Sequence, residues 1–143
     1  MRDMDPDSDP LMAVAREAMA RAYAPYSGYS VGAAIESEDG QAYGGCNVES
    51  ASSPAGLCAE RSALAAAVGA GHRRFLRIAI CCSEERPAAP CGVCRQALIE
   101  FGDIELVSEG STGERRTWTL SELLPDAFTL RPRTTPPTPG TRA

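Results

Sequence analysis

The chain has 143 residues, of which 43% are hydrophobic and 23% are charged, and its formal net charge at pH 7 is −5. This length fits one globular domain with its own core and leaves no room for a second full domain. The acidic balance excludes the electrostatic footprint of a nucleic-acid polymer or an anionic membrane surface, because both are bound through clustered Lys and Arg; it favours a small, neutral or weakly charged ligand.

The N-terminal region begins with an acidic stretch and continues as a helix. Residues 1–9 have neither the basic start nor the apolar run of a secretory signal, and no segment approaches the length of a membrane span. We therefore expect a cytoplasmic protein in which residues 1–9 form a disordered acidic tail. Asp9 and Pro10 supply an N-cap and a first-turn signal for the helix. One apolar face predicts that this helix docks on a core, and it consists of Leu11, Val14, Ala15, Ala18, Met19 and Ala22.

A β-hairpin is predicted next. Residues 25–29, with the sequence PYSGY, form a turn that leads into a strand over Val31–Glu36. Asp39-Gly40 is a strong signal for a hairpin turn. A second strand is therefore expected to run back from Ala42 to Val48.

Helices and strands then alternate. Residues 58–68, CAERSALAAAV, are small and apolar nearly all round, as in a helix buried between other elements. Residues 75–82 form a near-continuous apolar run, which is typical of a central strand covered on both faces. Residues 91–101 show helical spacing again, and residues 104–107 form a short strand. Because helices separate the later strands, their connections are crossovers, and we predict an α/β sandwich around a mixed sheet.

The C-terminal region closes the fold with a final strand or turn. Thr119 and Glu122 resemble the ends of a capping box that opens a last helical turn over Ser121–Leu124. Beyond Leu130 the sequence is too rich in Pro and Thr to pack, so residues 131–143 are expected to form a second disordered tail. The predicted folded domain is residues 10–130.

The six cysteines need an explanation other than disulfides, because the expected compartment is reducing. Cys91 and Cys94 lie where a loop enters a helix, so they project from one face of its first turn and can bind one ion. A bare pair of this kind is equally well explained as two small buried residues. Cys58 lies at the start of another predicted helix. A crossover can bring both helix starts to one edge of the sheet, where open α/β sheets bind their ligands.

Three cysteines at one place favour zinc, because thiolates are soft ligands. Three protein ligands leave one position of a tetrahedral site open, which is the pattern of a catalytic zinc whose water loses a proton near neutral pH. A closed structural site needs a fourth ligand, yet the only histidine, His72, is expected at the surface. The remaining cysteines lie in predicted strands, where they are explained as small buried side chains: Cys46, Cys81 and Cys82.

Charged residues next to these cysteines complete the predicted site. Three thiolates leave the zinc centre with a net negative charge, which the two helix N-termini, Arg61 and Arg95 could offset; each arginine is also explained as a solvated helix residue. Glu60 lies inside an apolar helix, where a lone carboxylate is costly. It converges with Cys58 only if Cys58 occupies the non-helical position before the helix, and Glu60 is then a proton shuttle beside the zinc-bound water.

Five sequence blocks extend over nearly all of the chain between the tails. They are PYSGYSVGAA at 25–34, NVES at 47–50, CAER at 58–61, PCGVCRQ at 90–96 and LLPDAF at 123–128. In this order they closely resemble the small, zinc-dependent, homotetrameric cytidine deaminases. The resemblance implies a three-layer α/β/α sandwich around a mixed five-stranded sheet.

The same resemblance implies the metal chemistry. One Zn²⁺ per chain is held by Cys58, Cys91 and Cys94, and Glu60 takes a proton from the bound water. The hydroxide attacks C4 of cytosine, and Glu60 delivers protons to N3 and to the departing amino group. The implied activity is deamination of cytidine and deoxycytidine to uridine and deoxyuridine plus ammonia, a reaction of pyrimidine salvage.

The substrate contacts are also implied by the resemblance. Asn47 and Glu49 match the pair that holds a sugar hydroxyl, although as isolated residues they are equally well explained as polar turn residues. Tyr29 stands beside the substrate where the family usually has Phe. Phe128 matches an aromatic residue that reaches the base in a neighbouring subunit, so the expected protein is a homotetramer with shared active sites and a small nucleoside substrate.

Two positions depart from the family pattern. Ser50 and Ser53 replace an Asn and a Tyr of the usual NVENASY block, which affects subunit packing and the edge of the sugar pocket rather than the metal. One alternative is therefore a deaminase of a modified cytosine nucleoside, of the blasticidin type, although Glu49 favours ordinary cytidine. Another is an inactive, zinc-stabilised interaction module. Glu60 argues against it, because a structural zinc gains nothing from a buried acid.

Overall fold

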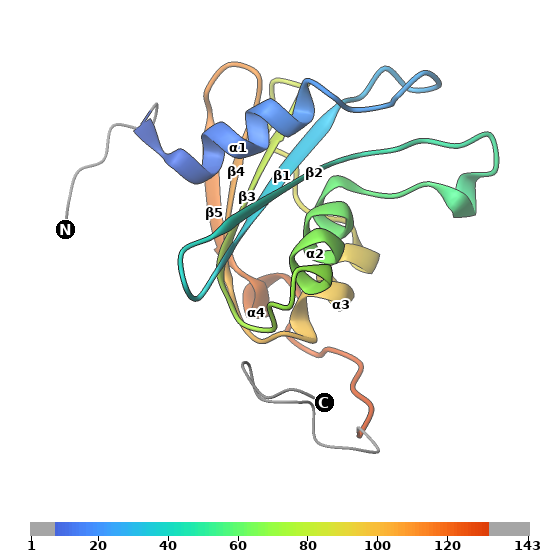
Figure 1. The fold of residues 1–143 in the computed structure, drawn as a ribbon. Helices are drawn as coiled ribbons and strands as arrows, with labels where there is room; N and C mark the ends of the chain where they lie inside the picture. Colours follow the sequence, from blue (N-terminus) through green and yellow to red (C-terminus); the bar gives the residue numbers. More distant parts are fainter. Residues whose placement is uncertain (1–7, 132–143) are drawn as a thin grey trace.

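A computed structural model of the chain describes residues 8–131 (Figure 1). In chain order its elements are α1 (Pro10–Met19), β1 (Val31–Ser37), β2 (Ala42–Cys46), the 3₁₀ turn η2 (Ser53–Ala55), α2 (Ala59–Gly69), β3 (Phe75–Cys82), α3 (Gly92–Ile99), β4 (Glu105–Glu109), β5 (Arg115–Thr119) and α4 (Leu120–Leu123). None of the helices in the described range has the length and apolar character that crossing a membrane requires.

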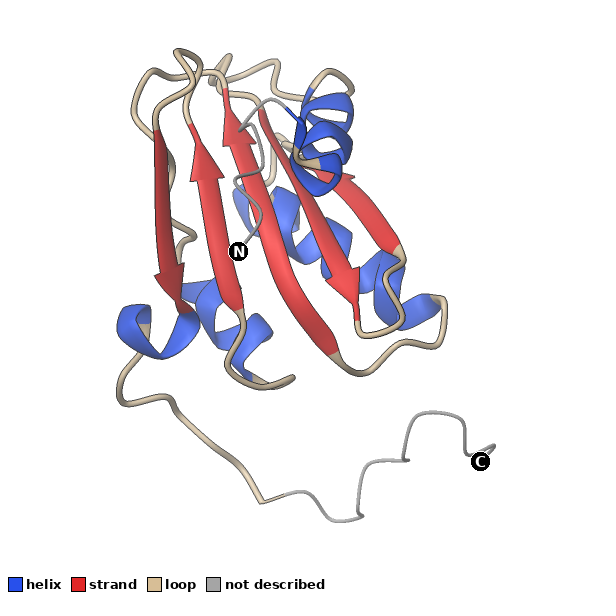
Figure 2. Cartoon of the chain, turned by 90° about the vertical axis from the view of Figure 1, so that its left-hand side faces the viewer, coloured by secondary structure: helices blue, strands red, loops and turns tan. Residues whose placement is uncertain are grey.

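The strands form one mixed sheet in the order β2-β1-β3-β4-β5. β3 and β4 are parallel and are connected through α3, whereas the other neighbouring pairs are antiparallel. Figure 2 shows the sheet from its broad side, with α1 in front of it and the other helices behind. The predicted three-layer α/β/α sandwich around a mixed five-stranded sheet is therefore confirmed.

Strand residues alternate between two core layers, one on each face of the sheet. On β1, Ala33 and Ile35 pack in the layer of α2 and α3, whereas Ala34 between them packs in the layer of α1. On β3, Ile80 belongs to the first layer and Ala79 to the second. This period of two is what a strand covered on both faces requires, so the apolar run over residues 75–82 has the central place that we expected.

Two glycines let helices approach the β1–β2 hairpin closely. A Cβ on Gly32 would lie 2.0 Å from the carbonyl oxygen of Ala15 in α1, and a Cβ on Gly45 would lie 2.3 Å from the backbone nitrogen of Ala63 in α2. No side chain fits at either position, because the contacted atoms belong to helix backbone. The hairpin is thus held between two helices, and the start of α2 is fixed relative to the sheet.

Some element boundaries differ from the predicted ones. α1 ends at Met19, one turn before the predicted Ala22. β2 ends at Cys46, although Val48 still pairs in isolated bridges with other segments. At the C-terminal end, where we expected a strand or a turn, the chain forms both, β5 followed directly by α4.

The start of α4 is not capped as predicted. The Thr119 side chain makes no capping hydrogen bond to the helix backbone. Instead, the carboxylate of Asp103 accepts hydrogen bonds from the backbone N–H of Ser121 at 2.8 Å and from its hydroxyl at 2.7 Å. Asp103, in the loop before β4, therefore supplies the hydrogen-bond acceptor that we expected from the Thr119 side chain.

Asp9 anchors the start of α1 to the sheet. Its carboxylate accepts a hydrogen bond from the backbone N–H of Leu11 at 3.1 Å, so it is the predicted N-cap. It also accepts two hydrogen bonds from the Arg77 guanidinium, at 3.0 and 2.8 Å. Arg77 lies on β3 and in turn binds Glu36 on β1 at 3.0 Å. The helix and two central strands are joined by this charged group.

The predicted tails lie almost entirely outside the described residues, which leave out residues 1–7 and 132–143. At the N-terminal boundary, however, Asp9 is only 7% exposed and belongs to the fold. The expected acidic tail therefore does not extend as far as Asp9, because the carboxylate pairs with Arg77, which is distant in the sequence.

These paired carboxylates predict a loss of stability in acid. The guanidinium of Arg77 holds the pKa of Asp9 below its usual range, and that of Arg16 does the same for Glu109. A carboxylate whose pKa is lowered by folding stabilises the protein above its unfolded pKa and loses this contribution as the pH falls through the folded value. The Tm should therefore fall below about pH 5. Asp9→Asn retains a capping oxygen but not the charge, so we expect its Tm at neutral pH to be lower by on the order of 5 °C.

Thermal unfolding of both proteins between pH 3 and pH 7 measures this effect. The difference in Tm between wild type and Asp9→Asn should shrink as the pH falls, because Asp9 becomes protonated in the folded state as the pH passes through its lowered pKa. Asp126→Asn changes an exposed carboxylate and should follow the wild type. A difference that stays constant over the whole pH range would contradict the role assigned to the Asp9 charge.

Candidate active site

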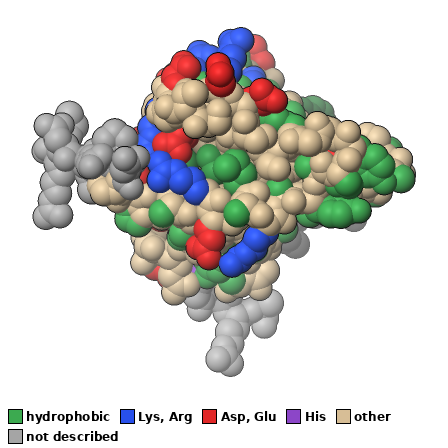
Figure 3. All heavy atoms as spheres, turned by 90° about the horizontal axis from the view of Figure 1, so that it is seen from above, with side chains coloured by type: hydrophobic (Ala, Val, Ile, Leu, Met, Phe, Trp, Pro, Cys, Tyr) green, Lys and Arg blue, Asp and Glu red, His purple; other side chains and the backbone are tan. Residues whose placement is uncertain are grey.

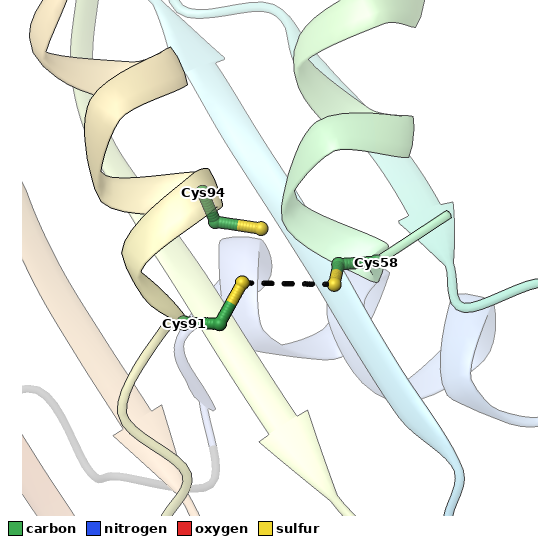
Figure 4. Close-up of side chains that lie close together, drawn as sticks. All are labelled: Cys58, Cys91 and Cys94. Atoms are coloured by element: carbon green, nitrogen blue, oxygen red, sulfur yellow. Dashed lines mark hydrogen bonds between the residues drawn. The ribbon is translucent and has the colours of Figure 1, made fainter. Parts of the chain in front are cut away.

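Three cysteines from two helix starts meet at one point. Cys58 is the N-cap of α2 and Cys91 is the N-cap of α3, each with an extended backbone, and Cys94 lies in the first turn of α3. Their sulfur atoms all lie within 4.8 Å of one another. Figure 4 shows the three side chains directed toward the space between the two helices. The structure thus brings together the three residues that the sequence analysis selected.

This sulfur cluster has the dimensions of a thiolate metal site. A Zn–S bond is about 2.3 Å long, so the sulfur atoms of a tetrahedral site lie about 3.8 Å apart. Cys58 Sγ and Cys91 Sγ are 3.9 Å apart. Within residues 8–131, no histidine or carboxylate joins the three sulfur atoms as a fourth member. The cluster can therefore hold one soft metal ion and leave a coordination position open.

The three thiols differ in how readily they lose a proton. Burial raises the pKa of Cys58 and also that of Cys94. Burial opposes ionisation of Cys91 as well, yet the backbone N–H groups at the start of α3 hold the pKa of Cys91 below its usual value. The start of α3 therefore stabilises a thiolate, which is the effect that we expected from its N–H groups.

The two arginines that follow the cysteines make different contacts. Arg61 Nη2 lies 3.9 Å from Cys58 Sγ, where its charge can balance that of the thiolates. Arg95 instead donates from Nε to the carbonyl oxygen of Pro90 at 2.7 Å and from Nη1 to that of Leu123 at 2.9 Å. Arg95 therefore joins the loop before α3 to the end of α4 and makes no such contact with the sulfur atoms.

Glu60 is buried beside the sulfur cluster. It lies in the first turn of α2 and is only 5% exposed. The Cys94 thiol donates a hydrogen bond to Glu60 Oε2 at 3.4 Å. Cys58 has a ψ of 153°, which is the non-helical backbone that convergence with Glu60 required. Burial raises the pKa of Glu60 above that of an ordinary glutamate.

Two hollows meet at the sulfur cluster. The inner hollow has a volume of about 180 Å³, and its wall includes Glu60 and Tyr29. The outer hollow has a volume of about 700 Å³, and its wall includes Glu49 and Arg61. Both hollows share three residues, which are Asn47, Cys58 and Cys91. An elongated molecule can therefore place one end beside Glu60 and the other beside Glu49.

Asn47 binds the backbone at the beginning of β1. Its Oδ1 accepts a hydrogen bond from the N–H of Val31 at 2.9 Å, and its Nδ2 donates to the carbonyl oxygen of Tyr29 at 2.7 Å. Both ends of the amide are thus engaged with the segment that carries Tyr29. Asn47, the predicted sugar-binding residue, therefore also holds the backbone of one wall of the inner hollow in place.

Glu49 binds the turn that precedes this segment. Its Oε1 accepts hydrogen bonds from the N–H groups of Tyr26 at 3.0 Å and Ser27 at 3.1 Å. Its Oε2 accepts one from the Ser27 hydroxyl at 2.5 Å. The hydroxyl contact, together with the N–H contacts, holds the pKa of Glu49 below its usual value. Glu49 is therefore a carboxylate at the edge of the outer hollow.

Tyr29 forms one wall of the inner hollow with a half-buried ring. Burial raises the pKa of the Tyr29 hydroxyl, so Tyr29 borders the inner hollow as a neutral phenol.

Phe128 does not line either hollow of its own chain. It is 69% exposed, and its carbonyl oxygen accepts a hydrogen bond from Gln96 Nε2 at 2.8 Å. Tyr26 and Val48 are also exposed, on the two loops that project beyond β1 and β2. Figure 3 shows hydrophobic side chains gathered at the end of the molecule where these loops project. Because its own side chain is exposed, Phe128 is available for contact with another molecule.

The remaining cysteines and the histidine are not part of the sulfur cluster. Cys81 and Cys82 are buried, as predicted, and Cys46 is half-buried. His72, which we expected at the surface, is half-buried instead, with its Nε2 at 2.7 Å from the Tyr43 hydroxyl. The β1–β2 hairpin brings Tyr43 next to His72, which follows the end of α2. The distance between Tyr43 and His72 in the sequence does not indicate this contact.

Two polar residues in these contacts were missed by the sequence analysis. Ser27 binds Glu49, and Gln96 binds the backbone of Phe128. The only signal for Ser27 was its place in a turn, where serine is common for local reasons. Gln96 lies inside the PCGVCRQ block, but the cysteines of that block already explained its chemistry, so nothing indicated a separate role for Gln96.

The chain is similar in sequence and fold to several known proteins. Residues 6–109 match the family described as the cytidine and deoxycytidylate deaminase zinc-binding region. The cytidine deaminase of Sporosarcina psychrophila is 40% identical over 124 residues, which cover 85% of this chain and 91% of that protein. The crystal structure of cytidine deaminase from Burkholderia pseudomallei has a TM-score of 0.79 and 46% identity, covering 82% of this chain and 96% of that one. For cytidine deaminase from Mycobacterium tuberculosis the TM-score is 0.74 and the identity 40%, covering 90% and 100%.

Proposed function

Because the chain belongs to the family of zinc-binding cytidine and deoxycytidylate deaminases, we propose that it hydrolyses cytidine and deoxycytidine to uridine and deoxyuridine with release of ammonia. One observation carries this proposal. A buried carboxyl group, Glu60, lies against a cluster of three thiols at the junction of two hollows. A structural metal site has no use for such an acid, whereas hydrolysis needs one to move protons.

Cys58, Cys91 and Cys94 would hold one Zn²⁺ per chain, because their sulfur atoms are close enough to bind one ion. A zinc ion in such a site supplies Lewis acidity, which lowers the pKa of water and makes it a nucleophile at neutral pH. Arg61 and the N–H groups at the start of α3 reduce the negative charge of the three thiolates. Without this compensation the thiolates would work against the formation of a nucleophile.

Glu60 moves the protons of the reaction. The attacking water must lose both of its protons, one as it attacks and one from the hydroxyl group then formed at C4, while ring N3 and the leaving amino nitrogen must each gain one. Glu60 reaches the inner hollow from α2 and is almost fully shielded from bulk water. A carboxylate in this place takes up each proton from the oxygen atom and passes it on, the first to N3 and the second to the amino nitrogen, so the products are the uracil nucleoside and ammonia.

The two hollows suit the two parts of a nucleoside. In this proposal the base lies in the inner hollow, which Glu60 and Tyr29 line. The outer hollow then receives the sugar beside Glu49, whose carboxylate accepts a hydrogen bond from a sugar hydroxyl. Asn47 borders both hollows and lies where base and sugar join.

A nucleoside fits these walls better than a nucleotide does. Among the residues that line the two hollows, Arg61 is the only cation, and its guanidinium lies against the Cys58 sulfur atom. Glu49 adds a negative charge to the outer hollow. A phosphate group would meet repulsion from Glu49 there, and the one cation is already engaged with the Cys58 sulfur atom. The walls therefore favour cytidine over deoxycytidylate, the other substrate in the family's description.

The experiment that tests this function is an ammonia-release assay on the purified, zinc-loaded protein. Cytidine, deoxycytidine, deoxycytidylate, free cytosine and a blasticidin-type nucleoside are supplied separately, and the two nucleosides should be turned over best. The modified nucleoside is included because Ser50 and Ser53, with their small side chains, line the outer hollow. Faster turnover of the blasticidin-type nucleoside would favour a deaminase of modified cytosine nucleosides. If none of the compounds releases ammonia, the protein is instead the inactive, zinc-stabilised interaction module.

The active unit that we propose is a homotetramer in which Phe128 completes the pocket of a neighbouring subunit. Its support is the exposure of Phe128 and its attachment to α3, the helix that carries two of the cysteines, through Gln96. We further propose residues 10–130 as the catalytic domain, with Asp9 as its first anchored residue. A cytoplasmic location is supported by the six free cysteines.

Phe128→Ala is expected to raise the KM for cytidine by about tenfold, because an aromatic side chain buried against a base contributes about 1–3 kcal/mol. Zinc content should not change, since Phe128 makes no contact with the cysteines of its own chain that the structure records. A protein that ends after Leu130 should keep its assembly and activity. Light scattering and steady-state kinetics measure both, and a fully active monomer would contradict the shared pocket.

A further inference from the structure

The Ser27 hydroxyl lies between two residues that line different hollows of the site. It donates a hydrogen bond to Glu49 Oε2 at 2.5 Å and accepts one from the backbone N–H of Tyr29 at 3.0 Å. Glu49 belongs to the outer hollow and Tyr29 to the inner hollow. Ser27 itself is exposed, so packing of a core does not explain why a serine stands there.

The contacts of Glu49 leave room for only one ligand group. An ionised carboxylate has about four acceptor positions. Two on Oε1 are occupied by the N–H groups of Tyr26 and Ser27, and one on Oε2 is occupied by the Ser27 hydroxyl. The remaining position is on Oε2, the oxygen that the Ser27 hydroxyl binds. The hydroxyl therefore determines where a single sugar hydroxyl can bind.

Tyr29 is held from both sides by the same group of residues. Its N–H is bound to the Ser27 hydroxyl, and its carbonyl oxygen is bound to Asn47 Nδ2 at 2.7 Å. One oxygen atom, that of the Ser27 hydroxyl, thus connects the Glu49 carboxylate with the backbone that carries the Tyr29 ring.

We infer that Ser27 is a positioning residue that makes placement of the base depend on capture of a sugar hydroxyl by Glu49. This inference rests on the proposed deamination of cytidine. Its consequence is that a sugar hydroxyl contributes to turnover, as well as to binding, through Ser27. A merely structural serine would affect substrates with and without sugar hydroxyls equally.

The test compares cytidine with 2′,3′-dideoxycytidine, which lacks the 2′ and 3′ hydroxyls of the sugar ring and keeps only the 5′ hydroxyl, on the zinc-loaded protein. Ser27→Ala should lower kcat/KM for cytidine by about tenfold, the effect of a hydrogen bond to a charged group, and should lower kcat as well as raise KM. For dideoxycytidine the change should stay within about twofold. Ser27→Thr keeps the hydroxyl and should restore both parameters. Ser27→Cys has a weaker donor and should lie between wild type and Ser27→Ala.

Two further measurements separate positioning from structure. The double variant Ser27→Ala/Glu49→Gln should be no less active on cytidine than Glu49→Gln alone, because Ser27 acts through Glu49. Calorimetry with uridine, which is not turned over, should show about tenfold weaker binding to Ser27→Ala. Ser121→Ala is the matched control, since the Ser121 hydroxyl and N–H bind Asp103 in the same way at the start of α4.

The outcomes distinguish this inference from the proposed function. Wild-type protein that releases no ammonia from cytidine would overturn the function, and the inference with it. An active wild type in which Ser27→Ala lowers kcat/KM equally for both nucleosides would overturn the inference alone. So would losses from Ser27→Ala and Glu49→Gln that add fully in the double variant.

Discussion

Glu60→Gln is expected to lower kcat for cytidine by about 10²–10⁴-fold while the zinc content stays near that of the wild type. The amide of Gln keeps the shape of the side chain and can still hydrogen-bond to water, but it cannot take up a proton and return it. The zinc should remain because the three sulfur atoms form the cluster without Glu60. Burial of a neutral amide also carries a smaller penalty than burial of a charge, so the fold should be preserved.

Zinc content by atomic absorption, together with single-turnover kinetics, measures the two effects separately. Glu100→Gln, which changes an exposed carboxylate directly after α3, is the matched control and should retain both zinc and activity. If Glu60→Gln loses zinc, Glu60 supports the metal ligands and the proton-transfer role assigned here is wrong.

Free cytosine is expected to be deaminated with a kcat/KM on the order of a thousandfold below that of cytidine, because binding of the remote sugar assists the chemistry at the base. Glu49 is the group through which we expect much of this assistance. Glu49→Ala should lower kcat/KM for cytidine by about 10–100-fold, the range of a hydrogen bond to a charged group, and should change cytosine turnover far less.

Glu49→Gln separates the effect of Glu49 on the turn at residues 26–27 from its effect on binding of the sugar hydroxyl. Gln retains an oxygen for the N–H groups of Tyr26 and Ser27, so it should preserve the turn better than Ala while weakening the contact with a sugar hydroxyl. Steady-state kinetics with cytidine and cytosine provide the comparison. Equal turnover of the two substrates by the wild type would exclude a role for the sugar.

Periodic patterns made much of the fold predictable. The apolar run of β3 indicated a central strand because both of its faces are covered, and its residues divide between the two core layers. β5 carries no such pattern. Its sequence, RRTWT, is largely polar because the strand lies at an edge of the sheet, and only pairing with β4 shows it to be a strand.

The metal site could be predicted further than its surroundings. Cys58, Cys91 and Cys94 carry a chemistry that few other residues share, and their positions at helix starts follow from local signals. The contacts of Ser27 and Arg95 depend on how loops and helix ends meet, which no local pattern encodes. The two hollows are likewise formed by segments that are distant in the sequence.

The position of β5 also bears on how the chain avoids unwanted association. A strand at the edge of a sheet exposes unpaired N–H and C=O groups to which a strand of another molecule can bind. Here that edge carries two arginines: Arg115 is paired with Glu109 at 3.1 Å, and the guanidinium of Arg116 lies 4.9 Å from the centre of the Trp118 ring. Two copies that approached through this edge would bring like charges together. A strand without any catalytic group thus disfavours edge-to-edge pairing of two copies of the chain.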